Sequence, residues 1–376
     1  MKIGLLSWII DRKRTGVDNY LYNLINSFIK EGKSQHMSLI HYNKTSDPVY
    51  TKVHDVIIPT FGPSKFTKIF GMPYAIKKEG IDILHVPMHW PTQILSFFFN
   101  YNVKKILTIH DITPLLIPET HTAETKRWWL SSLNLIKNRA DIIITDSSNT
   151  KKDCVKYLDI PKDRIRVIHL AADPMYKPFK NKETAIKDLN NNYNLNLPFI
   201  LAVGTLEKRK NIPTLIRAFN QLKKKGIKHK LVLIGGKGWK YNEIFHTIDK
   251  LNLKEEVLFM GYVPDEDLVK FYNTADLFVY PSIYEGFGLP PLEAMACGCP
   301  VVTSNSSSLP EVVGDAGIMV DPYNSDDLAD KIYEILNNRN LRAKLCNKSL
   351  KRAKMFNWEK TARETWKVYE EVFEKE

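Results

Sequence analysis

Short runs of Val, Ile and Leu alternate with amphipathic segments along most of the chain, and this alternation constrains the fold more than any other feature. It is typical of βαβ units, in which crossover helices cover a parallel sheet. In the first half of the sequence, the apolar runs predict strands at residues 2–6, 38–42, 83–86, 106–109, 142–145 and 165–168. Helices are expected between them, including one at 17–30 and one at 125–138. This pattern predicts a doubly wound α/β domain over residues 1–180.

A second series of the same kind begins after residue 197. The stretch from 170 to 197 contains an asparagine run and no sustained apolar period, so we interpret it as the connection between two domains. Strands are then expected at residues 199–203, 230–234, 257–260, 277–280, 300–303 and 317–320. A second doubly wound domain is therefore predicted over residues 181–355. The last segment, 356–376, has aromatic residues at helical spacing and predicts a closing amphipathic helix.

The chain is long and apolar enough for two cores, and its charge is uneven. Its 376 residues are 44% hydrophobic, and the formal net charge is +12. Residues 1–190 carry 28 Lys and Arg against 18 Asp and Glu, which leaves 26 against 24 for the rest. This basic first half suits nucleic acid, an anionic membrane or phosphorylated substrates as partners, and equally a solvated lysine-rich surface.

Several features predict a cytoplasmic protein. The four cysteines lack the spacing of a metal site, which favours a reducing compartment. No cleavable signal peptide is evident, and the most apolar later run, 94–99, is far shorter than the roughly 18 residues of a membrane span. A peripheral contact with the anionic inner face of a membrane is a further hypothesis, since this run, Trp128 and Trp129 lie near basic residues. The alternative is that these aromatic residues are core.

The segment EGFGLPPLE, residues 285–293, places two carboxylates eight positions apart. Pro291 suits the first turn of a helix over 292–297, so Glu285 is expected in a loop and Glu293 in the first helical turn. The two glycines between them allow backbone N–H groups to approach a ligand closely. Glu293 is then able to accept hydrogen bonds from two ribose hydroxyls, and Glu285 from those of a second sugar. The alternative is that Glu293 only stabilises the N-terminus of its helix.

Other polar residues follow predicted strands, at the edge where doubly wound sheets bind ligands. Arg209 and Lys210 lie between a strand and a helix that Asn211 is expected to cap, and the two cations suit a diphosphate. His110 follows a strand of the first domain, and Gly16 precedes the first helix, where a turn can receive an anion. Each feature also has a simpler interpretation: a solvated basic pair, a core histidine and an ordinary helix start.

Together these segments resemble the retaining glycosyltransferases of the GT-B fold, family 4, over nearly the whole chain. The resemblance rests on E-x7-E at 285–293, GTLEKRKN at 204–211, TIHD at 108–111, TGVDNY at 15–20 and FNWEKTARETWKVY at 356–369. It is closest to the mannosyltransferases that use GDP-mannose. It implies an α/β GT-B fold with two Rossmann-like domains facing each other across a cleft. The C-terminal helix is expected to pack back on the first domain.

The resemblance also implies roles for individual residues. Glu285 is expected to hold hydroxyls of the donor sugar, and His110 to lie beside the anomeric centre. Arg209 and Lys210 are expected to neutralise the diphosphate. These four residues form the expected catalytic set, and the expected donor-binding residues are Gly16, Gly204, Thr205, Val263, Phe287, Gly288, Leu289 and, on the ribose, Glu293. Two positions depart from the family pattern: Asp18 replaces a second glycine, and Thr205 stands where some branches have a phosphate-binding arginine.

The resemblance implies an enzyme that moves a hexose, with mannose from GDP-mannose as the first choice, to a hydroxyl of a glycan or lipid-linked acceptor. Such enzymes need no metal and no cofactor besides the nucleotide-sugar, and residues 265–267, Asp-Glu-Asp, are interpreted as a helix start. The alternatives are a UDP-sugar donor, a GT-B sugar-nucleotide epimerase and a glycoside hydrolase, which also uses two carboxylates. A basic nucleic-acid-binding module is a further alternative, but no RRM, helix-turn-helix or zinc-finger pattern accompanies the charge, and no nucleic-acid partner is expected.

Overall fold

Two compact units make up the chain in the computed structural model, which describes residues 1–8, 10, 16–43, 47–59, 70–89, 102–195, 198–238 and 241–374. The first unit comprises Met1–Pro118, Thr122–Leu170 and Asn357–Glu376, and the second comprises Glu119–His121 and Ala171–Phe356. Apart from the short segment Glu119–His121, the chain therefore enters the second unit after Leu170 and returns to the first at Asn357.

The first unit contains a seven-stranded sheet with the strand order β3-β2-β1-β4-β5-β6-β7, in which all neighbours pair in parallel. Its strands are β1 (Ile3–Leu6), β2 (Met37–His41), β3 (His54–Ile57), β4 (Ile83–Val86), β5 (Lys104–Ile109), β6 (Ile142–Thr145) and β7 (Ile165–Val167). The predicted doubly wound domain is confirmed. The sequence did not predict the edge strand β3, because only Val56 of its four residues is buried and no apolar run marks it.

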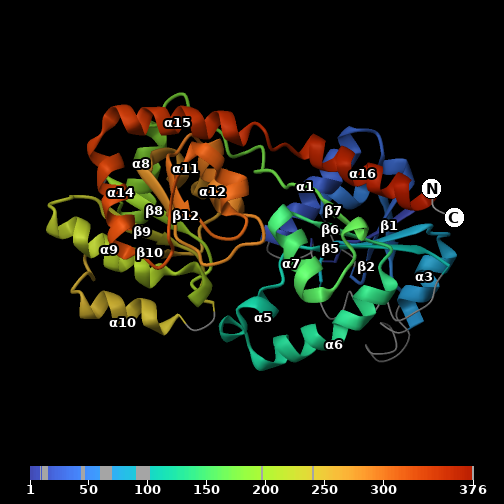
Figure 1. Ribbon diagram of the computed structural model, residues 1–376. Coiled ribbons are helices and arrows are strands. Elements are labelled where there is room, and N and C mark those ends of the chain that lie inside the picture. Colours follow the sequence, from blue (N-terminus) through green and yellow to red (C-terminus); the bar gives the residue numbers. More distant parts are fainter. Residues whose placement is uncertain are drawn as a thin grey trace. The chain divides into compact units, whose positions relative to one another are not determined.

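Helices cover both faces of this sheet (Figure 1). They are α1 (Gly16–Lys30), α3 (Met72–Lys78), α5 (Thr113–Leu116), α6 (Ala123–Arg139), α7 (Ser148–Leu158) and α16 (Trp358–Glu374). Helices α3, α6 and α7 share one hydrophobic core with the strands, to which they contribute Met72, Trp129 and Cys154. Short 3-10 helices lie at Ser34–His36, Pro48–Thr51, Pro118–Thr120 and Lys162–Arg164.

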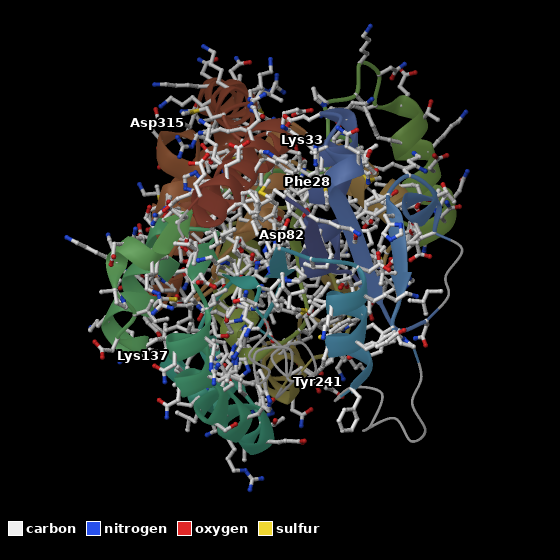
Figure 2. The ribbon with its side chains drawn as sticks, turned by 90° about the vertical axis from the view of Figure 1, so that its right-hand side faces the viewer. Phe28, Lys33, Asp82, Lys137, Tyr241 and Asp315 are labelled. Atoms are coloured by element: carbon white, nitrogen blue, oxygen red, sulfur yellow. The ribbon has the colours of Figure 1, made fainter. Side chains whose placement is uncertain are left out.

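The predicted closing helix is confirmed as α16, which packs against α1. The ring of Phe28 on α1 lies 5.7 Å from the ring of Trp366 and 5.9 Å from that of Tyr369. Thr361 Oγ1 also donates to the carbonyl of His169, at 2.7 Å. Phe28 lies inside the first unit, whereas Lys137 on α6 lies at its surface (Figure 2). Aromatic packing therefore attaches the end of the chain to its beginning.

The second unit contains a six-stranded parallel sheet with the order β10-β9-β8-β11-β12-β13. Its strands are β8 (Phe199–Val203), β9 (Lys230–Ile234), β10 (Val257–Gly261), β11 (Leu277–Tyr280), β12 (Val301–Ser304) and β13 (Ile318–Val320). All six lie within two residues of their predicted positions. Continuous apolar runs marked the four inner strands, because strands covered on both faces are buried along their length, whereas the edge strands β10 and β13 are apolar but only partly buried.

Helices cover this second sheet as well. They are α8 (Glu183–Tyr193), α9 (Ile212–Lys224), α10 (Asn242–Lys250), α11 (Asp265–Thr274), α12 (Leu289–Ala296), α13 (Leu309–Val313), α14 (Ser325–Asn337) and α15 (Arg339–Ala353), with 3-10 helices at Lys208–Lys210 and Gly314–Ala316. Helix α8 corrects the interpretation of residues 170–197 as a plain connection. The sequence did not mark α8, because only two of its residues, Ala185 and Leu189, are buried. Tertiary contacts hold it against α11: the hydroxyl of Tyr193, on α8, donates to Asp267, on α11, at 2.6 Å.

Candidate active site

Three glycines shape the carboxyl edge of the second sheet, at the ends of β8, β9 and β10. Gly204 N–H donates to Ile234 O at 2.8 Å, and Gly235 N–H donates to Gly261 O at 2.7 Å. A Cβ atom on Gly235 would lie 2.0 Å from Gly204 O, and both residues have a φ of +147°. A side chain is therefore excluded at Gly235, on the edge where sheets of this kind bind ligands.

A buried ion network connects the end of β8 with the loop after β11. One carboxylate oxygen of Glu285 accepts from Arg209 Nη1 at 2.7 Å, and the other accepts from Lys210 Nζ at 2.7 Å. Ser282 Oγ also donates to Glu285, at 2.5 Å. Arg209 Nη2 in turn donates to Glu207 at 2.7 Å. Glu285 is 7% exposed and Lys210 9% exposed, so these charges interact with little screening by water.

The network keeps Glu285 ionised. Burial by itself raises the pKa of a carboxyl group, but the charges of Arg209 and Lys210 and the hydrogen bonds from Lys210 and Ser282 outweigh it and lower the pKa of Glu285 to about 2. Burial and the charge of Arg209 lower the pKa of Lys210, while Glu285 opposes this shift. Lys210 Nζ also donates to Tyr280 OH, at 2.6 Å. Within the described chain, two of its three N–H bonds are thus engaged, which leaves one for a ligand.

Glu293 lies in a different environment from Glu285. Tyr272 OH donates to Glu293 Oε2 at 2.9 Å. Burial, reinforced by the charges of Asp265 and Asp173 and opposed by the hydrogen bond from Tyr272, raises the pKa of Glu293 to about 7. The two ends of the EGFGLPPLE segment therefore hold one strongly acidic and one weakly acidic carboxyl group.

The predicted position of Glu293 in the first helical turn is wrong. Helix α12 begins at Leu289, with two prolines in its first turn and Gly288 at the N-cap. Glu293 is therefore the fifth residue of the helix, where the effect of the N-terminal dipole has fallen off. This position weakens the interpretation of Glu293 as a residue that only stabilises the helix start. The predicted helix end is confirmed, since Cys297 is the C-cap and Gly298 has a φ of +77°.

The loop between the two carboxylates is buried and fixed. Ser308 Oγ approaches the carbonyls of Glu285 and Phe287, at 2.9 and 2.6 Å, and Ser307 Oγ accepts from Glu285 N–H at 2.9 Å. Gly288 has a φ of +120°, and a Cβ there would lie 2.9 Å from Leu309 Cδ2. A glycine is therefore required, and the backbone between Glu285 and Leu289 is held in place before any ligand binds.

Asn211 occupies the predicted N-cap of α9 but does not cap it with its side chain. Its φ is +57°, and its amide donates to the carbonyls of Pro281 and Pro322 at 3.1 and 2.6 Å. Thr214 Oγ1 donates to the amide oxygen at 2.8 Å. Because its amide N–H groups reach loops after β11 and β13, Asn211 connects three strand ends. The expectation that Asn211 caps α9 with its side chain is therefore wrong, and the side chain instead holds the loops around the ion network in place.

His110 follows β5 and contacts Asp146, which follows the neighbouring β6. Nδ1 lies 2.6 Å from Asp146 Oδ2, and Nε2 lies 2.9 Å from the carbonyl oxygen of Pro87. A carbonyl can only accept, so Nε2 carries a proton. Burial lowers the pKa of His110, but the charge of Asp146 and its hydrogen bond outweigh this effect and raise it. Sequence reasoning missed Asp146, although an acid directly after the next strand was a visible signal.

The other predicted residues have the following positions. Gly16 is the first residue of α1, while Thr15 of the same motif lies outside the described residues. Asp18 is buried in the first turn of α1. Thr205 is exposed after Gly204, and Val263 is 3% exposed after β10. The second unit therefore brings together Gly204, Arg209, Lys210 and Glu285, whereas His110 and Gly16 belong to the first unit.

Metal and membrane features were also predicted from the sequence. Residues 265–267 begin α11, which confirms the helix-start interpretation. No group of three or more His, Cys, Asp and Glu residues in the described part of the chain is arranged to hold a metal ion. No helix among the same residues is long and apolar enough to cross a membrane. Trp129 belongs to the core and the half-buried Trp128 packs against it, which supports the alternative interpretation of these two residues as core, and residues 94–99 lie outside the described chain.

Comparison with known proteins identifies both units. The family described as Glycosyltransferase Family 4 matches residues 14–175, and Glycosyl transferases group 1 matches residues 183–352. The O-antigen chain mannosyltransferase B of Escherichia coli is 36% identical over 277 residues, which cover 73% of this chain and 72% of that protein. The serotype-specific mannosyltransferase WbdA of Escherichia coli is 31% identical over 264 residues, which cover 69% of this chain and 32% of WbdA.

Solved structures share the fold over the full length. Sucrose-phosphate synthase from Thermosynechococcus elongatus has a TM-score of 0.80 and 22% identity, covering 99% of both chains. Anabaena HepE, solved in complex with UDP and glucose, has a TM-score of 0.77 and 19% identity, covering 98% of this chain and 99% of that one. Two parallel-sheet Rossmann-like domains, both family matches and the mannosyltransferase relatives lead to one conclusion: the chain is a glycosyltransferase of family 4, group 1, with the GT-B fold.

Proposed function

We propose that the enzyme transfers mannose from GDP-mannose, with retention of configuration, to a hydroxyl of a glycan or lipid-linked acceptor, and that it does so without a metal ion. The observation that carries this proposal is the buried network of Glu285, Arg209 and Lys210. In this network Glu285 is able to accept hydrogen bonds from sugar hydroxyls, and Arg209 and Lys210 are able to bind the departing diphosphate. The choice of mannose is supported by the relatives named as mannosyltransferases.

The cations act on the leaving group. As the bond between the anomeric carbon and the phosphate oxygen breaks, negative charge grows on the diphosphate, and fixed positive groups stabilise it without reorganising. Lys210 is held by Glu285 and Tyr280, and its remaining N–H is available for a phosphate oxygen. Arg209 is held by Glu285 and Glu207 and adds a second fixed charge.

Glu285 binds the sugar and does not attack it. With a pKa of about 2 it is anionic at neutral pH, and the hydrogen bonds from Arg209, Lys210 and Ser282 occupy part of its electron density. The acceptor oxygen therefore bonds to the anomeric carbon on the face from which the diphosphate leaves. The acceptor proton passes to the departing phosphate oxygen, so that the products are the new glycoside and protonated GDP.

His110 is proposed to contribute a positive charge that Asp146 holds in a fixed position. Both ring nitrogens are engaged, one by Asp146 and one by the Pro87 carbonyl, and Asp146 raises the pKa of the imidazole. The ring is therefore suited to the imidazolium form, which has no lone pair with which to accept a proton. We propose that His110 stabilises the donor sugar beside the anomeric centre and that Asp146 positions it.

The residues after β10 suit a guanine base. Glu293 is proposed to accept hydrogen bonds from the ribose hydroxyls, and Val263 to contact the base. Asp265 raises the pKa of Glu293 by its charge, and it begins α11 two residues after Val263. A carboxylate here is able to accept from the N1–H and N2–H groups of guanine, whereas uracil presents one N–H between two carbonyl acceptors. This chemistry favours GDP over UDP.

The basic first unit is proposed to face an anionic, lipid-linked acceptor at the inner surface of a membrane, which makes the enzyme cytoplasmic and peripheral. On α6, Leu130 is 59% exposed and Arg127 is also exposed. An apolar side chain near a cation suits the boundary of an anionic bilayer. Binding to vesicles that rises with their anionic lipid content supports this proposal, and binding independent of that content contradicts it.

Thermal stabilisation by GDP, UDP, ADP, GDP-mannose and UDP-glucose tests the donor assignment, with and without EDTA. We expect stabilisation by the two guanine nucleotides that persists in EDTA and is lost in Glu293→Ala. Stabilisation by uridine nucleotides alone refutes the guanine assignment, and loss in EDTA refutes metal independence. NMR of the product's anomeric carbon then tests retention.

A further inference from the structure

The second unit has an open cavity at the end of its sheet opposite to the candidate active site. Its walls include Asp276, directly before β11, and Cys299, two residues before β12. These positions lie at the amino ends of parallel strands, whereas Glu285 and Gly204 follow carboxyl ends. The cavity has a volume of about 330 Å³, within the range of roughly 300–1,000 Å³ for small-molecule sites. The donor site described above does not use it.

Basic side chains dominate the polar lining of this cavity. Arg339 and Arg342, on the first turn of α15, and Lys182, at the N-cap of α8, contribute three positive charges. Asp276 contributes one negative charge, so the net charge of these four groups is +2. The Arg342 guanidinium is fixed, because Nη1 donates to Asp276 at 3.0 Å. In the described chain, the side chains of Arg339 and Lys182 form no ion pair or hydrogen bond and are free to bind an anion.

We propose that this cavity binds the phosphate monoester of a sugar-sized molecule, with the phosphate between Arg339 and Lys182. A phosphate monoester carries a charge of about −1.5 to −2 at pH 7, which matches the net charge of the lining. Guanidinium groups present paired N–H donors that fit phosphate oxygens. The volume exceeds that of the phosphate alone and leaves room for a small polar body.

The fourth cysteine provides a local reporter of occupancy. Cys346 lines the same cavity and is partly exposed, whereas Cys154, Cys297 and Cys299 are buried. A ligand that fills the cavity covers the Cys346 thiol. Its alkylation by N-ethylmaleimide, followed by peptide mass mapping, therefore measures binding at this cavity alone, even if the same ligand also enters the donor site.

The experiment compares mannose 6-phosphate with mannose, and with sodium chloride at matched ionic strength. If ligand and reagent exclude each other, mannose 6-phosphate at about ten times its Kd slows alkylation of Cys346 about tenfold, by mass action. Mannose and sodium chloride leave the rate unchanged. The double variant Lys182→Glu, Arg339→Glu loses the protection, while the double variant Lys344→Glu, Lys351→Glu, an equal charge change at two exposed positions of α15 outside the cavity, keeps it.

Three results overturn the proposal: no protection in the wild type, equal protection by sodium chloride, or protection that persists in the double variant. A folding defect is separated from a binding defect by the thermal midpoint of each variant. The Glu293→Ala variant is expected to keep the protection, and saturating GDP is expected to give none. A failure of the donor-site assignment is therefore distinguishable from a failure of this one.

Discussion

Glu285 and Glu293 belong to one nine-residue segment, yet their carboxyl groups have opposite properties. At Glu285, a lysine, an arginine and a serine hydroxyl lower the pKa to about 2. At Glu293, burial and neighbouring acids raise it to about 7, and a single tyrosine hydroxyl opposes them. The spacing of two acids therefore indicates where the site is, whereas residues of neighbouring loops and helices determine the protonation state of each acid.

The difference suits two tasks in one donor. A carboxylate locked to cations stays ionised beside a sugar and a diphosphate at any physiological pH. The half-buried carboxyl group of Glu293 has lost part of its hydration and accepts from a single tyrosine hydroxyl, so ligand hydroxyls are able to supply further hydrogen bonds. We therefore expect Glu285 and its cations to govern the turnover number, and Glu293 to govern the affinity for the donor.

The largest effect is expected when a cation of the Glu285 network is removed. Lys210→Ala removes the charge that faces both Glu285 and the leaving phosphate, and we expect kcat with GDP-mannose to fall about 10²–10³-fold. GDP release measures it. Lys208→Ala, at an exposed position of the same 3-10 helix, is the matched control and should retain kcat. An unchanged kcat in Lys210→Ala contradicts the role of the network.

The next effect separates the two ends by steady-state kinetics. Glu293→Gln removes a charged acceptor of ribose hydroxyls, so KM for GDP-mannose should rise about 10–100-fold while kcat changes little. Glu285→Gln should mainly lower kcat, because it disturbs Lys210 and Arg209. If both variants change the same parameter by the same factor, the two carboxylates do not have separate tasks.

The pH dependence of stability should have opposite signs at the two ends. The folded pKa of Glu293 is raised from 4.5 to about 7, so its stabilising contribution is present below 4.5 and is lost as the pH rises towards 7. The folded pKa of Glu285 is lowered from 4.5 to about 2, so its contribution is present above 4.5 and is lost as the pH falls towards 2.

Urea unfolding at pH 5 and pH 8 checks this contrast. Glu293→Gln should gain stability relative to the wild type on going from pH 5 to pH 8, by about 1–2 kcal/mol after allowance for the partial exposure of this group. Glu285→Gln should be less stable than the wild type at both values. A Glu293→Gln variant with the wild-type pH dependence contradicts the raised pKa.

The smallest effect concerns Tyr272. Tyr272→Phe removes the hydroxyl that donates to Glu293, so the pKa of Glu293 should rise further and GDP affinity at pH 7 should fall by about 1 kcal/mol, roughly fivefold. Calorimetric titration with GDP measures it. Tyr193→Phe, which loses a similar hydrogen bond to Asp267, is the control. Equal losses in both variants indicate a general weakening of the unit.

Strong local patterns made much of the fold predictable. The buried strands of both sheets have continuous apolar runs, and the aromatic spacing of α16 predicted a helix. The edge strand β3 and helix α8 were missed, because each depends on packing against neighbours and neither has a sustained apolar period of its own. Arg209, Lys210 and Glu285 were identifiable because they follow strands or lie in a compact motif.

The partners that set the chemistry were only partly visible in the sequence. Ser282 lies three residues before Glu285, and Asp146 directly follows the strand next to that of His110, whereas Tyr272 reaches Glu293 only through the three-dimensional fold. The helix start at Leu289, which moves Glu293 into the second turn, depends on a Gly288 conformation that proline placement alone did not reveal. Desolvation and distant charges produce the pKa contrast, and neither is visible in a nine-residue sequence.

The most direct test of the two-carboxylate account is a 13C NMR titration of the glutamate side-chain carboxyl carbons, in the wild type and in the variants Glu285→Gln and Glu293→Gln. We predict one resonance that titrates near pH 7 and vanishes in Glu293→Gln, and another that stays ionised down to about pH 2 and vanishes in Glu285→Gln. Saturating GDP should abolish the titration near pH 7. If both carboxyl groups titrate near pH 4.5, the contrast between the two ends does not exist.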